Sequence, residues 1–415
     1  MFKKIQDIIQ KLYKYPVQSL STIFFLVITI SVIILILFFD KSPQLFLIDD
    51  GYYQIGKNFF EGKQTLFHSF RWPGLPLLFT TLNFFPDFLH PYLRLLLALV
   101  FMYGNIWVAK KIFQQYFSNK QFFWGGLISL CNPLILHWTL KSTPEIYLTF
   151  FIGIVYLIIR RLLKEYSHKL LAILIFIIII GMAVKPVFFI IPFLFFIYVI
   201  LIKRKNLIFP FFIVFFTIIT SFVVLHQLTA PSEANNIPYG IYDLLGPTFL
   251  PSSMLETRTI SFGSQQELMN NNPEESNLAT GMKKLNTWIT QYKVNHPNSS
   301  NTQMIIIFIK DNLWPFIFIK LLNPVLFITL ASKTPETLSN LLINGLLIIF
   351  AFIKLRELYR IEKNSIIPFI LVLLGYASVF FLTFSYARYS FPVMFYIGFL
   401  GGVKLISIVT KKVRK

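Results

Sequence analysis

The sequence has 415 residues, of which 55% are hydrophobic and only 13% are charged. Soluble globular chains carry about 25% charged residues, so this composition excludes a soluble enzyme and indicates a polytopic membrane protein. The formal net charge of +20 would suggest nucleic-acid binding in a soluble chain, but in a membrane protein lysines and arginines gather in cytoplasmic loops. We therefore expect membrane lipids, and no nucleic acid, among the partners.

Ten apolar runs of roughly 15–20 residues predict an all-α fold with about ten transmembrane helices. In chain order they are residues 20–39, 93–109, 122–136, 146–159, 170–184, 186–202, 207–225, 338–353, 366–384 and 391–409. No small-residue cleavage site follows the first run, so we expect it to be a retained anchor. Residues 304–330 are apolar but interrupted by charges and prolines, which favours an interfacial or re-entrant segment over a crossing.

The charges in the loops give the expected orientation. With the N-terminus in the cytoplasm, alternate loops and the C-terminal tail carry three or more Lys or Arg each, as the positive-inside rule asks. Only four of the 18 acidic residues then face the cytoplasm, namely Asp7, Glu165, Glu357 and Glu362. The acidic chemistry is therefore expected on the extracytoplasmic side.

Two long extracytoplasmic regions divide the chain into three predicted parts. Residues 1–228 form an N-terminal transmembrane module with the first extracytoplasmic loop at 40–91, residues 229–337 form a large extracytoplasmic loop with an interfacial helical segment, and residues 338–415 form the C-terminal transmembrane helices. Within the large loop, five apolar residues share one helical face, which predicts an amphipathic helix lying on the rest of the protein. These are Leu278, Met282, Leu285, Ile289 and Tyr292.

The first outer loop contains two adjacent carboxylates, Asp49 and Asp50, close to an apolar span. A carboxylate in a partly dry pocket has a raised pKa and can remove a proton from a hydroxyl group, which makes it a candidate general base. The alternative is a solvated Asp-Asp-Gly turn that caps the following helix. Tyr53 and His68 lie in the same loop and are candidate contacts of an acceptor.

Two more charged residues stand where the chain enters apolar runs on the outer side. Arg71 lies beside prolines and could bind a phosphate through its fork of donors, although anchoring at lipid headgroups is the ordinary alternative. Glu145 follows Pro144 at the mouth of a span. It is either a site residue or a first-turn acid that stabilises the helix dipole.

Lys185 and Arg388 are cations with little room for bulk solvation. Lys185 lies between two apolar runs that almost touch, so it must snorkel to the outer interface or pair with a lipid phosphate or an outer acid. Arg388, next to Tyr389, stands at the outer start of the last span. That position violates the positive-inside tendency, so we expect an anionic partner for Arg388. A lipid headgroup phosphate would also serve as this partner.

The order of these motifs resembles the GT-C superfamily of glycosyltransferases, and most closely the bacterial relatives of protein mannosyltransferases and the lipid A aminoarabinose transferase. The matching features are an acidic pair in the first outer loop, a basic and proline-rich re-entry at 71–76, Pro-Glu at 144–145, Lys-Pro at 185–186, and Arg-Tyr-x-x-Pro at 388–392. Each motif is weak by itself, and the ordered set over most of the chain carries the resemblance.

The resemblance implies transfer of a sugar from a polyprenyl-phosphate-linked donor to a lipid, glycan or protein acceptor, at the extracytoplasmic face of a bacterial inner membrane. Asp49 would be the general base, although Asp50 is a second candidate because the family often has Glu there. Glu145 would orient the acceptor, help the base or hold a cation. The expected ligands of the donor phosphate are Lys185, Arg388, Arg71 and Tyr389.

A divalent cation, Mg²⁺ or Mn²⁺, is left open. Asp49, Asp50 and Glu145 offer the hard oxygen ligands that these ions prefer, but no spacing in the sequence demands a metal site. The sequence also contains no Gly-rich phosphate loop, no His-Glu-x-x-His helix and no Gly-x-Ser-x-Gly turn, which are the signatures of other catalytic classes.

Two other functions fit the same composition. A polymerase or ligase of lipid-linked saccharides would rely on cations in the large loop, where only Arg258, Lys283, Lys284 and Lys293 are found. A lipid or sugar transporter, such as a flippase, would place ionisable residues near the middle of spans, whereas here most lie at span ends.

Overall fold

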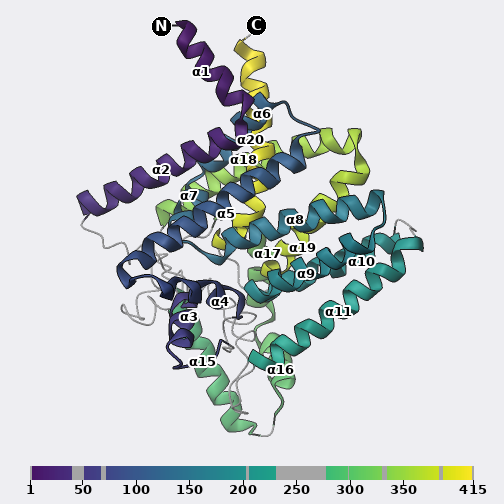
Figure 1. Ribbon diagram of the computed structural model, residues 1–415. Helices are drawn as coiled ribbons and strands as arrows, with labels where there is room; N and C mark the ends of the chain where they lie inside the picture. The colour runs from purple at the N-terminus through teal and green to yellow at the C-terminus, as the bar shows by residue number, and fades with distance from the viewer. Residues whose placement is uncertain are drawn as a thin grey trace. The chain divides into compact units, whose positions relative to one another are not determined.

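The computed structural model describes residues 2–39, 51–66, 72–201, 205–229, 277–297, 299–329, 334–382 and 387–413. These residues form α-helices and short 3-10 helices, without a β-strand (Figure 1), so the predicted all-α fold is confirmed. The chain divides into two compact units, which are described separately. Unit 1 comprises Met1–Ala230, Ile343–Tyr376 and Phe391–Lys415, and unit 2 comprises Pro231–Leu342 and Ala377–Ser390.

Unit 1 contains most of the helices. In chain order they are α1 (Phe2–Lys14), α2 (Pro16–Phe39), α3 (Tyr52–Phe60), α4 (Gly74–Thr80), η2 (Thr81–Phe84), η3 (Asp87–Leu89), α5 (His90–Phe113), α6 (Asn119–Leu130), α7 (Pro133–Leu140), α8 (Pro144–Lys164), α9 (His168–Val184), η4 (Pro186–Phe189), α10 (Ile190–Leu201), α11 (Lys205–Thr229) and α20 (Phe391–Val413). Helices α18 (Thr334–Ile361) and α19 (Lys363–Leu382) begin or end in unit 2.

Among the described residues, five helices are long and apolar enough to cross a membrane, which is compatible with a membrane protein. They span Pro16–Leu37, Asp87–Phe113, Pro144–Lys164, Asn206–Val224 and Phe391–Thr410. Shorter apolar helices lie at Gly74–Phe84, His168–Val184, Pro186–Ile200, Leu313–Val325 and Ser365–Phe381. The predicted count of ten spans is therefore not confirmed.

The predicted span at residues 122–136 is interrupted in the structure. Helix α6 ends at Leu130 and α7 begins at Pro133. Asn132 makes the break, because its side-chain oxygen accepts a hydrogen bond from the Leu134 amide at 3.0 Å, while Pro133 takes the first helical position. The buried Asn132 side chain also donates to the Asn344 side chain at 2.7 Å. The segment is therefore two short helices and not one continuous helix.

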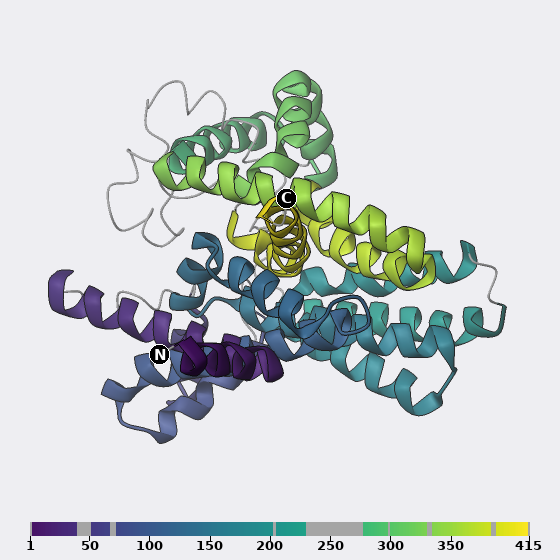
Figure 2. The same ribbon diagram turned by 90° about the horizontal axis from the view of Figure 1, so that it is seen from above.

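Helix α20 is packed closely by its neighbours in unit 1. It contacts α6 and α8 (Figures 1 and 2), and hydrogen bonds to the backbone tie it to both. Ser129 donates to the Phe395 carbonyl at 2.9 Å and Tyr396 donates to the Thr149 carbonyl at 2.9 Å. A Cβ atom on Gly402 would lie 2.8 Å from the Gly125 carbonyl oxygen, so only glycine permits this backbone approach.

At the end of unit 1 where α18 meets α19, Glu362 accepts three hydrogen bonds. The donors are the side chains of Gln115 at 2.6 Å, Tyr116 at 2.7 Å and Ser365 at 2.6 Å. Burial acts to raise the pKa of Glu362, but the hydrogen bonds from Ser365 and Tyr116 outweigh it and hold that pKa below the ordinary value. Burial and the bond to Glu362 raise the pKa of Tyr116 to about 12.

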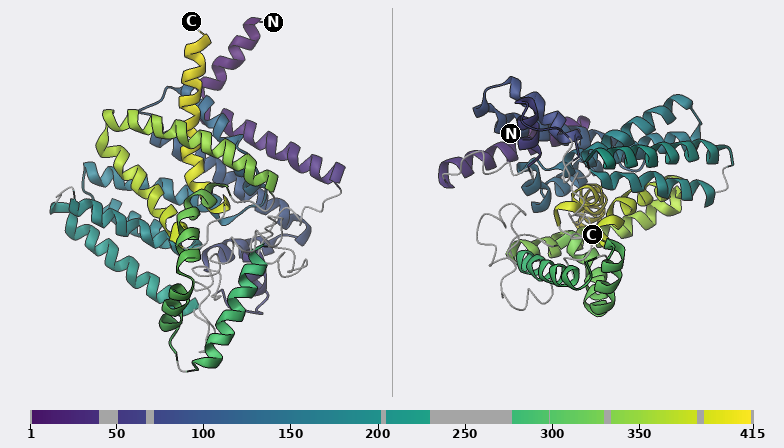
Figure 3. Two further views of the ribbon diagram at one scale, coloured as in Figure 1. Left: turned by 180° about the vertical axis from the view of Figure 1, so that it is seen from behind. Right: turned by 90° about the horizontal axis from the view of Figure 1, so that it is seen from below.

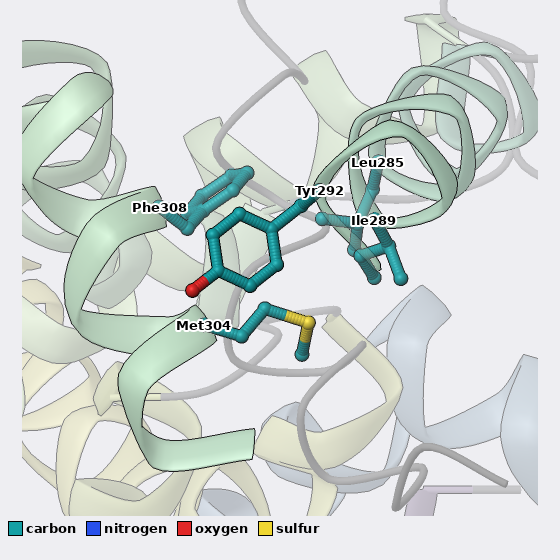
Figure 4. Packing of buried hydrophobic residues seen from close by; sticks show 5 residues of the cluster. All are labelled: Leu285, Ile289, Tyr292, Met304 and Phe308. Atoms are coloured by element: carbon teal, nitrogen blue, oxygen red, sulfur yellow. The ribbon is translucent and has the colours of Figure 1, made fainter. Parts of the chain in front are cut away.

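Unit 2 contains α15 (Asn277–Asn295), α16 (Asn301–Asp311), α17 (Leu313–Thr329) and η6 (Ala387–Ser390). Three residues of the predicted amphipathic face, Leu285, Ile289 and Tyr292, are buried with Met304 and Phe308 of α16 (Figure 4). The predicted face therefore packs against α16. The place of α15 relative to the membrane stays a prediction, as does that of residues 304–330.

Replacing Gly402 by Ala tests the glycine contact between α20 and α6. Because the added Cβ would lie 2.8 Å from the Gly125 oxygen, we expect the free energy of unfolding to fall by about 1–3 kcal/mol. Gly345→Ala is the matched control, because nothing lies within 4 Å of a Cβ there, and it should be neutral or stabilising by up to about 1 kcal/mol. Thermal unfolding in detergent measures both, and equal shifts would contradict the packing argument.

Replacing Glu362 by Gln tests the hydrogen bonds at the α18–α19 turn. At neutral pH we expect a loss of about 1–2 kcal/mol, because a carboxylate accepts hydrogen bonds more strongly than an amide. A lowered pKa stabilises the fold above the ordinary value of 4.5 and loses this effect as the pH falls through the lowered value. The difference from wild type should therefore shrink below pH ~4.5. Glu165→Gln, at an exposed glutamate, is the control and should have little effect at any pH.

Candidate functional site

The candidate site lies where the start of α8 meets the end of α9. The Lys185 ammonium, at the end of α9, contacts the Glu145 carboxylate, in the first turn of α8, at 2.7 Å. The side chain of Glu145 is fully buried and that of Lys185 is 16% exposed. Two residues that the sequence singled out separately are thus one buried ion pair.

Proline positions explain why these two side chains lie at helix ends. Pro144 occupies the first turn of α8, a position that tolerates its missing amide hydrogen. Lys185 is extended, with φ −156° and ψ 125°, as expected for a residue before proline, and it ends α9 before Pro186 begins η4. Glu145 is in the first turn, as the helix-dipole explanation requires, and it also pairs with Lys185.

The turn that precedes Glu145 is buried and strained. Thr139, Ser142 and Thr143 are fully buried, and Ser142 has φ +50°, a left-handed conformation that is costly for a residue with a side chain. The Ser142 hydroxyl donates to the Arg94 carbonyl at 3.1 Å and lies 3.3 Å from the Tyr147 hydroxyl. These contacts hold the turn against α5 and α8, so Glu145 has little freedom to move.

Helices α3 and α4, which belong to the predicted first outer loop, pack onto the same region. A Cβ on Gly74 would lie 2.7 Å from the Ala183 carbonyl carbon, so the start of α4 touches the end of α9 beside Lys185. Helix α3 packs on α4, and its N-cap residue is Gly51, with φ +86°. An aspartate therefore does not occupy the N-cap position of α3, contrary to the simplest form of the helix-cap alternative.

Arg94 is a buried cation of this region that the sequence analysis missed. It is 6% exposed, and its guanidinium lies 5.1 Å from the centre of the Tyr53 ring and 5.4 Å from that of Phe79. Guanidinium stays charged at any accessible pH, and the aromatic faces stabilise that charge. One signal was available, because Arg94 stands at the outer end of a predicted span, the same violation of the positive-inside tendency that drew attention to Arg388.

His90 connects Tyr53 to a more exposed pair of charges. The His90 ring contacts the Tyr53 hydroxyl through Nδ1 and the Phe85 carbonyl through Nε2, the latter at 2.8 Å. A carbonyl only accepts, so Nε2 carries the hydrogen and Nδ1 accepts from Tyr53 in a neutral ring. Asp87 lies 3.6 Å from Nδ1 and bonds Lys57 at 2.8 Å, and this bond raises the pKa of Lys57. Tyr53, predicted as an acceptor contact, is here held by His90.

Several predicted site residues are not brought together by the structure. Asp49, Asp50, His68 and Arg71 lie outside the described residues, and their roles stay predictions. Arg388 and Tyr389 belong to η6 in unit 2, where the Tyr389 ring stacks on Phe380 with 4.6 Å between ring centres. Only Glu145, Lys185 and Tyr53, all in unit 1, are placed in one part of the molecule.

Comparisons with family models, with curated proteins and with solved structures each found no match for this chain. The resemblance seen in the sequence motifs therefore stays a hypothesis.

The described residues offer no cluster of three or more His, Cys, Asp or Glu side chains that could hold a metal ion. Because Asp49 and Asp50 lie outside those residues, a site for Mg²⁺ or Mn²⁺ stays open.

The arrangement favours recognition of an oxyanion. Two cations and one carboxylate belong to this part of unit 1: Arg94 and Glu145 are buried, and Lys185 is 16% exposed. Fixed positive charge in a water-poor place stabilises a phosphate or a developing negative charge far more than it would in water. A phosphate bound beside these cations would be stabilised in this way.

Breaking the ion pair tests how strongly it holds the two helix ends together. Lys185→Met should lower the free energy of unfolding by about 3 kcal/mol, because it removes the cation beside a fully buried carboxylate. Glu145→Gln should cost less, because the Lys185 ammonium is partly exposed to solvent. The double variant Glu145→Gln with Lys185→Met should lose less free energy of unfolding than the sum of the two single losses. Thermal unfolding of all four proteins gives the coupling, and strictly additive losses would contradict a coupled pair.

The exposed pair Lys57 and Asp87 provides a matched control. Asp87 is 72% exposed, so Asp87→Asn should change the free energy of unfolding very little.

Proposed function

We propose that this protein transfers a sugar from a polyprenyl-phosphate-linked donor to a lipid, glycan or protein acceptor, at the extracytoplasmic face of the membrane. The observation that carries the proposal is the buried Glu145–Lys185 pair. It joins the Pro-Glu and Lys-Pro motifs, 40 residues apart, at the point where α4 of the first outer loop touches the end of α9. Three of the five motifs that resemble GT-C enzymes thus converge.

In the proposed reaction, Asp49 accepts the proton of the acceptor hydroxyl. The hydroxyl oxygen forms a bond to the anomeric carbon of the sugar, and the bond between that carbon and the phosphate oxygen breaks. Polyprenyl phosphate leaves with the electron pair. The rate of sugar transfer would come from two effects. The donor is held in line for attack, and the base next to the acceptor removes its proton.

The cations of the site would stabilise the charge that develops on the leaving phosphate. Lys185 is suited to this role because its ammonium is partly exposed while Glu145 fixes its position. Arg94 adds a second cation that its aromatic neighbours hold in place. Arg388, Arg71 and Tyr389 remain proposed phosphate ligands from the sequence alone.

Glu145 is proposed to position Lys185 and to orient the acceptor. Its carboxylate is fully buried, and the strained Ser142 turn holds the start of α8 in place. A positioned carboxylate that does not move during the reaction costs no reorganisation energy.

We further propose that the chain has about ten spans with its N-terminus in the cytoplasm of a bacterial cell. This orientation places the starts of α5 and α8 and the end of α9 on the extracytoplasmic side, together with most acidic residues. Polyprenyl-linked sugars are donors that such a face can use, whereas nucleotide sugars are cytoplasmic. A polymerase or ligase of lipid-linked saccharides is the second candidate, because it too would need cations that bind a lipid phosphate.

The transferase proposal is tested by sugar release from radiolabelled polyprenyl-phosphate sugars with purified protein. Asp49→Asn should lower turnover by about 10²–10⁴-fold, the usual contribution of a general base, while binding of the donor changes little. Asp50→Asn, measured in parallel, shows which carboxylate acts. Asp87→Asn is the control, because this exposed acid of the same outer region bonds Lys57, and its turnover should stay near that of wild type.

A wild-type protein that binds and cleaves none of the carrier-linked sugars would overturn the transferase. If the wild type instead lengthens or joins lipid-linked saccharides, the polymerase or ligase becomes the better conclusion.

A further inference from the structure

The N-terminal helix α1 separates its side chains into two faces. At 100° per residue, Phe2, Ile5, Ile8, Ile9, Leu12 and Tyr13 fall within an arc of roughly 140°, and every other residue falls outside it. The second face carries Lys3, Lys4, Lys11 and Lys14 with a single acid, Asp7. A short helix with an apolar stripe and a lysine-rich opposite face is typical of helices that lie in a membrane interface.

The exposure of the described side chains agrees with this division. Gln6, Asp7, Gln10, Lys11 and Lys14 of the polar face are all exposed, whereas Leu12 and Tyr13 of the apolar stripe are half-buried. Lys11 and Lys14 are therefore on the outside of the protein, where they can meet an external surface.

The chain changes direction sharply between α1 and α2, the first candidate span. Tyr15 bends the chain and Pro16 begins α2, and the two helices meet at a sharp corner in both side views (Figures 1 and 3). If α2 crosses the bilayer, a helix that leaves its end at such a corner runs along the membrane surface.

The last turn of α1 is fixed at this corner by aromatic contacts with α6. The Tyr13 hydroxyl accepts a hydrogen bond from the Trp124 indole at 3.0 Å, and its ring meets Phe123 edge to face with 5.7 Å between centres. Tyr13 lies at the border of the two faces in the helical arc, so this contact sets the rotation of α1 without using the middle of the apolar stripe.

Other features of this end of unit 1 are those of a membrane interface. Lys111 lies over the Trp107 ring and Lys120 over the Tyr13 ring, and the C-terminal end of α20, with Lys411 and Lys412, is found at the same end as α1 (Figure 1). Cations interleaved with Trp and Tyr mark the headgroup level of a bilayer, and clustered lysines beside a span favour anionic lipids.

We infer that α1 is an anionic-lipid-binding helix, with its apolar stripe at the boundary between headgroups and acyl chains and its lysines on lipid phosphates. Helix α1 binds the leaflet in which α2 begins. Its lysines are complementary in charge to acidic headgroups, and the corner at Pro16 directs α1 along that leaflet. The inference does not depend on the transferase activity, since it uses only α1, α2 and α6.

The test uses the full chain in nanodiscs of phosphatidylcholine, with or without about 30 mol% phosphatidylglycerol. The exposed thiol of Cys131 is first removed by Cys131→Ser, and an environment-sensitive fluorophore is attached at Ile9→Cys, on the apolar stripe, or at Gln10→Cys, on the polar face. Nitroxide-labelled lipids then report contact with the bilayer. We expect quenching at position 9 to be at least about three-fold stronger in the anionic discs, and quenching at position 10 to be weak in both.

Two charge variants separate lipid binding from ordinary packing. Lys4→Gln with Lys11→Gln should abolish the effect of phosphatidylglycerol at position 9, as should high salt, which shortens the Debye length to about 3 Å at 1 M. Lys63→Gln with Lys293→Gln removes the same amount of charge elsewhere and should leave the effect of phosphatidylglycerol at position 9 unchanged. Two results would overturn the inference and show that α1 packs on the protein instead. One is equal quenching in both kinds of disc, and the other is quenching at position 9 that changes neither with salt nor with the lysine substitutions.

Discussion

The candidate site depends on one electrostatic constraint, the pairing of the buried Glu145 carboxylate with the partly exposed Lys185 ammonium at opposite helix ends. Burying a carboxylate is costly unless a cation or hydrogen-bond donors compensate its charge, and here the meeting of the start of α8 with the end of α9 supplies the cation. Each charge also lies at the favourable end of its own helix, Glu145 at an N-terminus and Lys185 at a C-terminus. The close approach of Gly74 to Ala183 and the strained turn at Ser142 lie next to this pair in the chain.

The helical architecture was largely predictable because it depends on local composition. The apolar runs at 20–39, 93–109 and 146–159 all fall within single helices of the structure. The run at 122–136 is not one continuous helix, because Asn132 and Pro133 favour a new helix start over continuation. The helix break is therefore visible in the sequence at Asn132 and Pro133, but the average apolarity of the whole run hides these two residues.

The site was predictable only where a local feature pointed to it. Glu145 and Lys185 stood out because each is a charge beside a proline at the end of an apolar run, yet nothing local showed that they pair. Arg94 and His90 were missed because their partners, Tyr53 and Phe79, come from helices whose packing is non-local. Side chains that matter through contacts far apart in the chain leave no pattern in one sequence.

The Asn132–Asn344 hydrogen bond has a consequence for how the protein is made. Its two residues are 212 positions apart, and a ribosome adding about 5–20 residues per second needs roughly 10–40 s to cover that distance. During this time the break between α6 and α7 exists without its final amide partner. Water, lipid headgroups or the insertion machinery must satisfy the Asn132 side chain until α18 arrives, so assembly of unit 1 has to be completed after most of the chain has been synthesised.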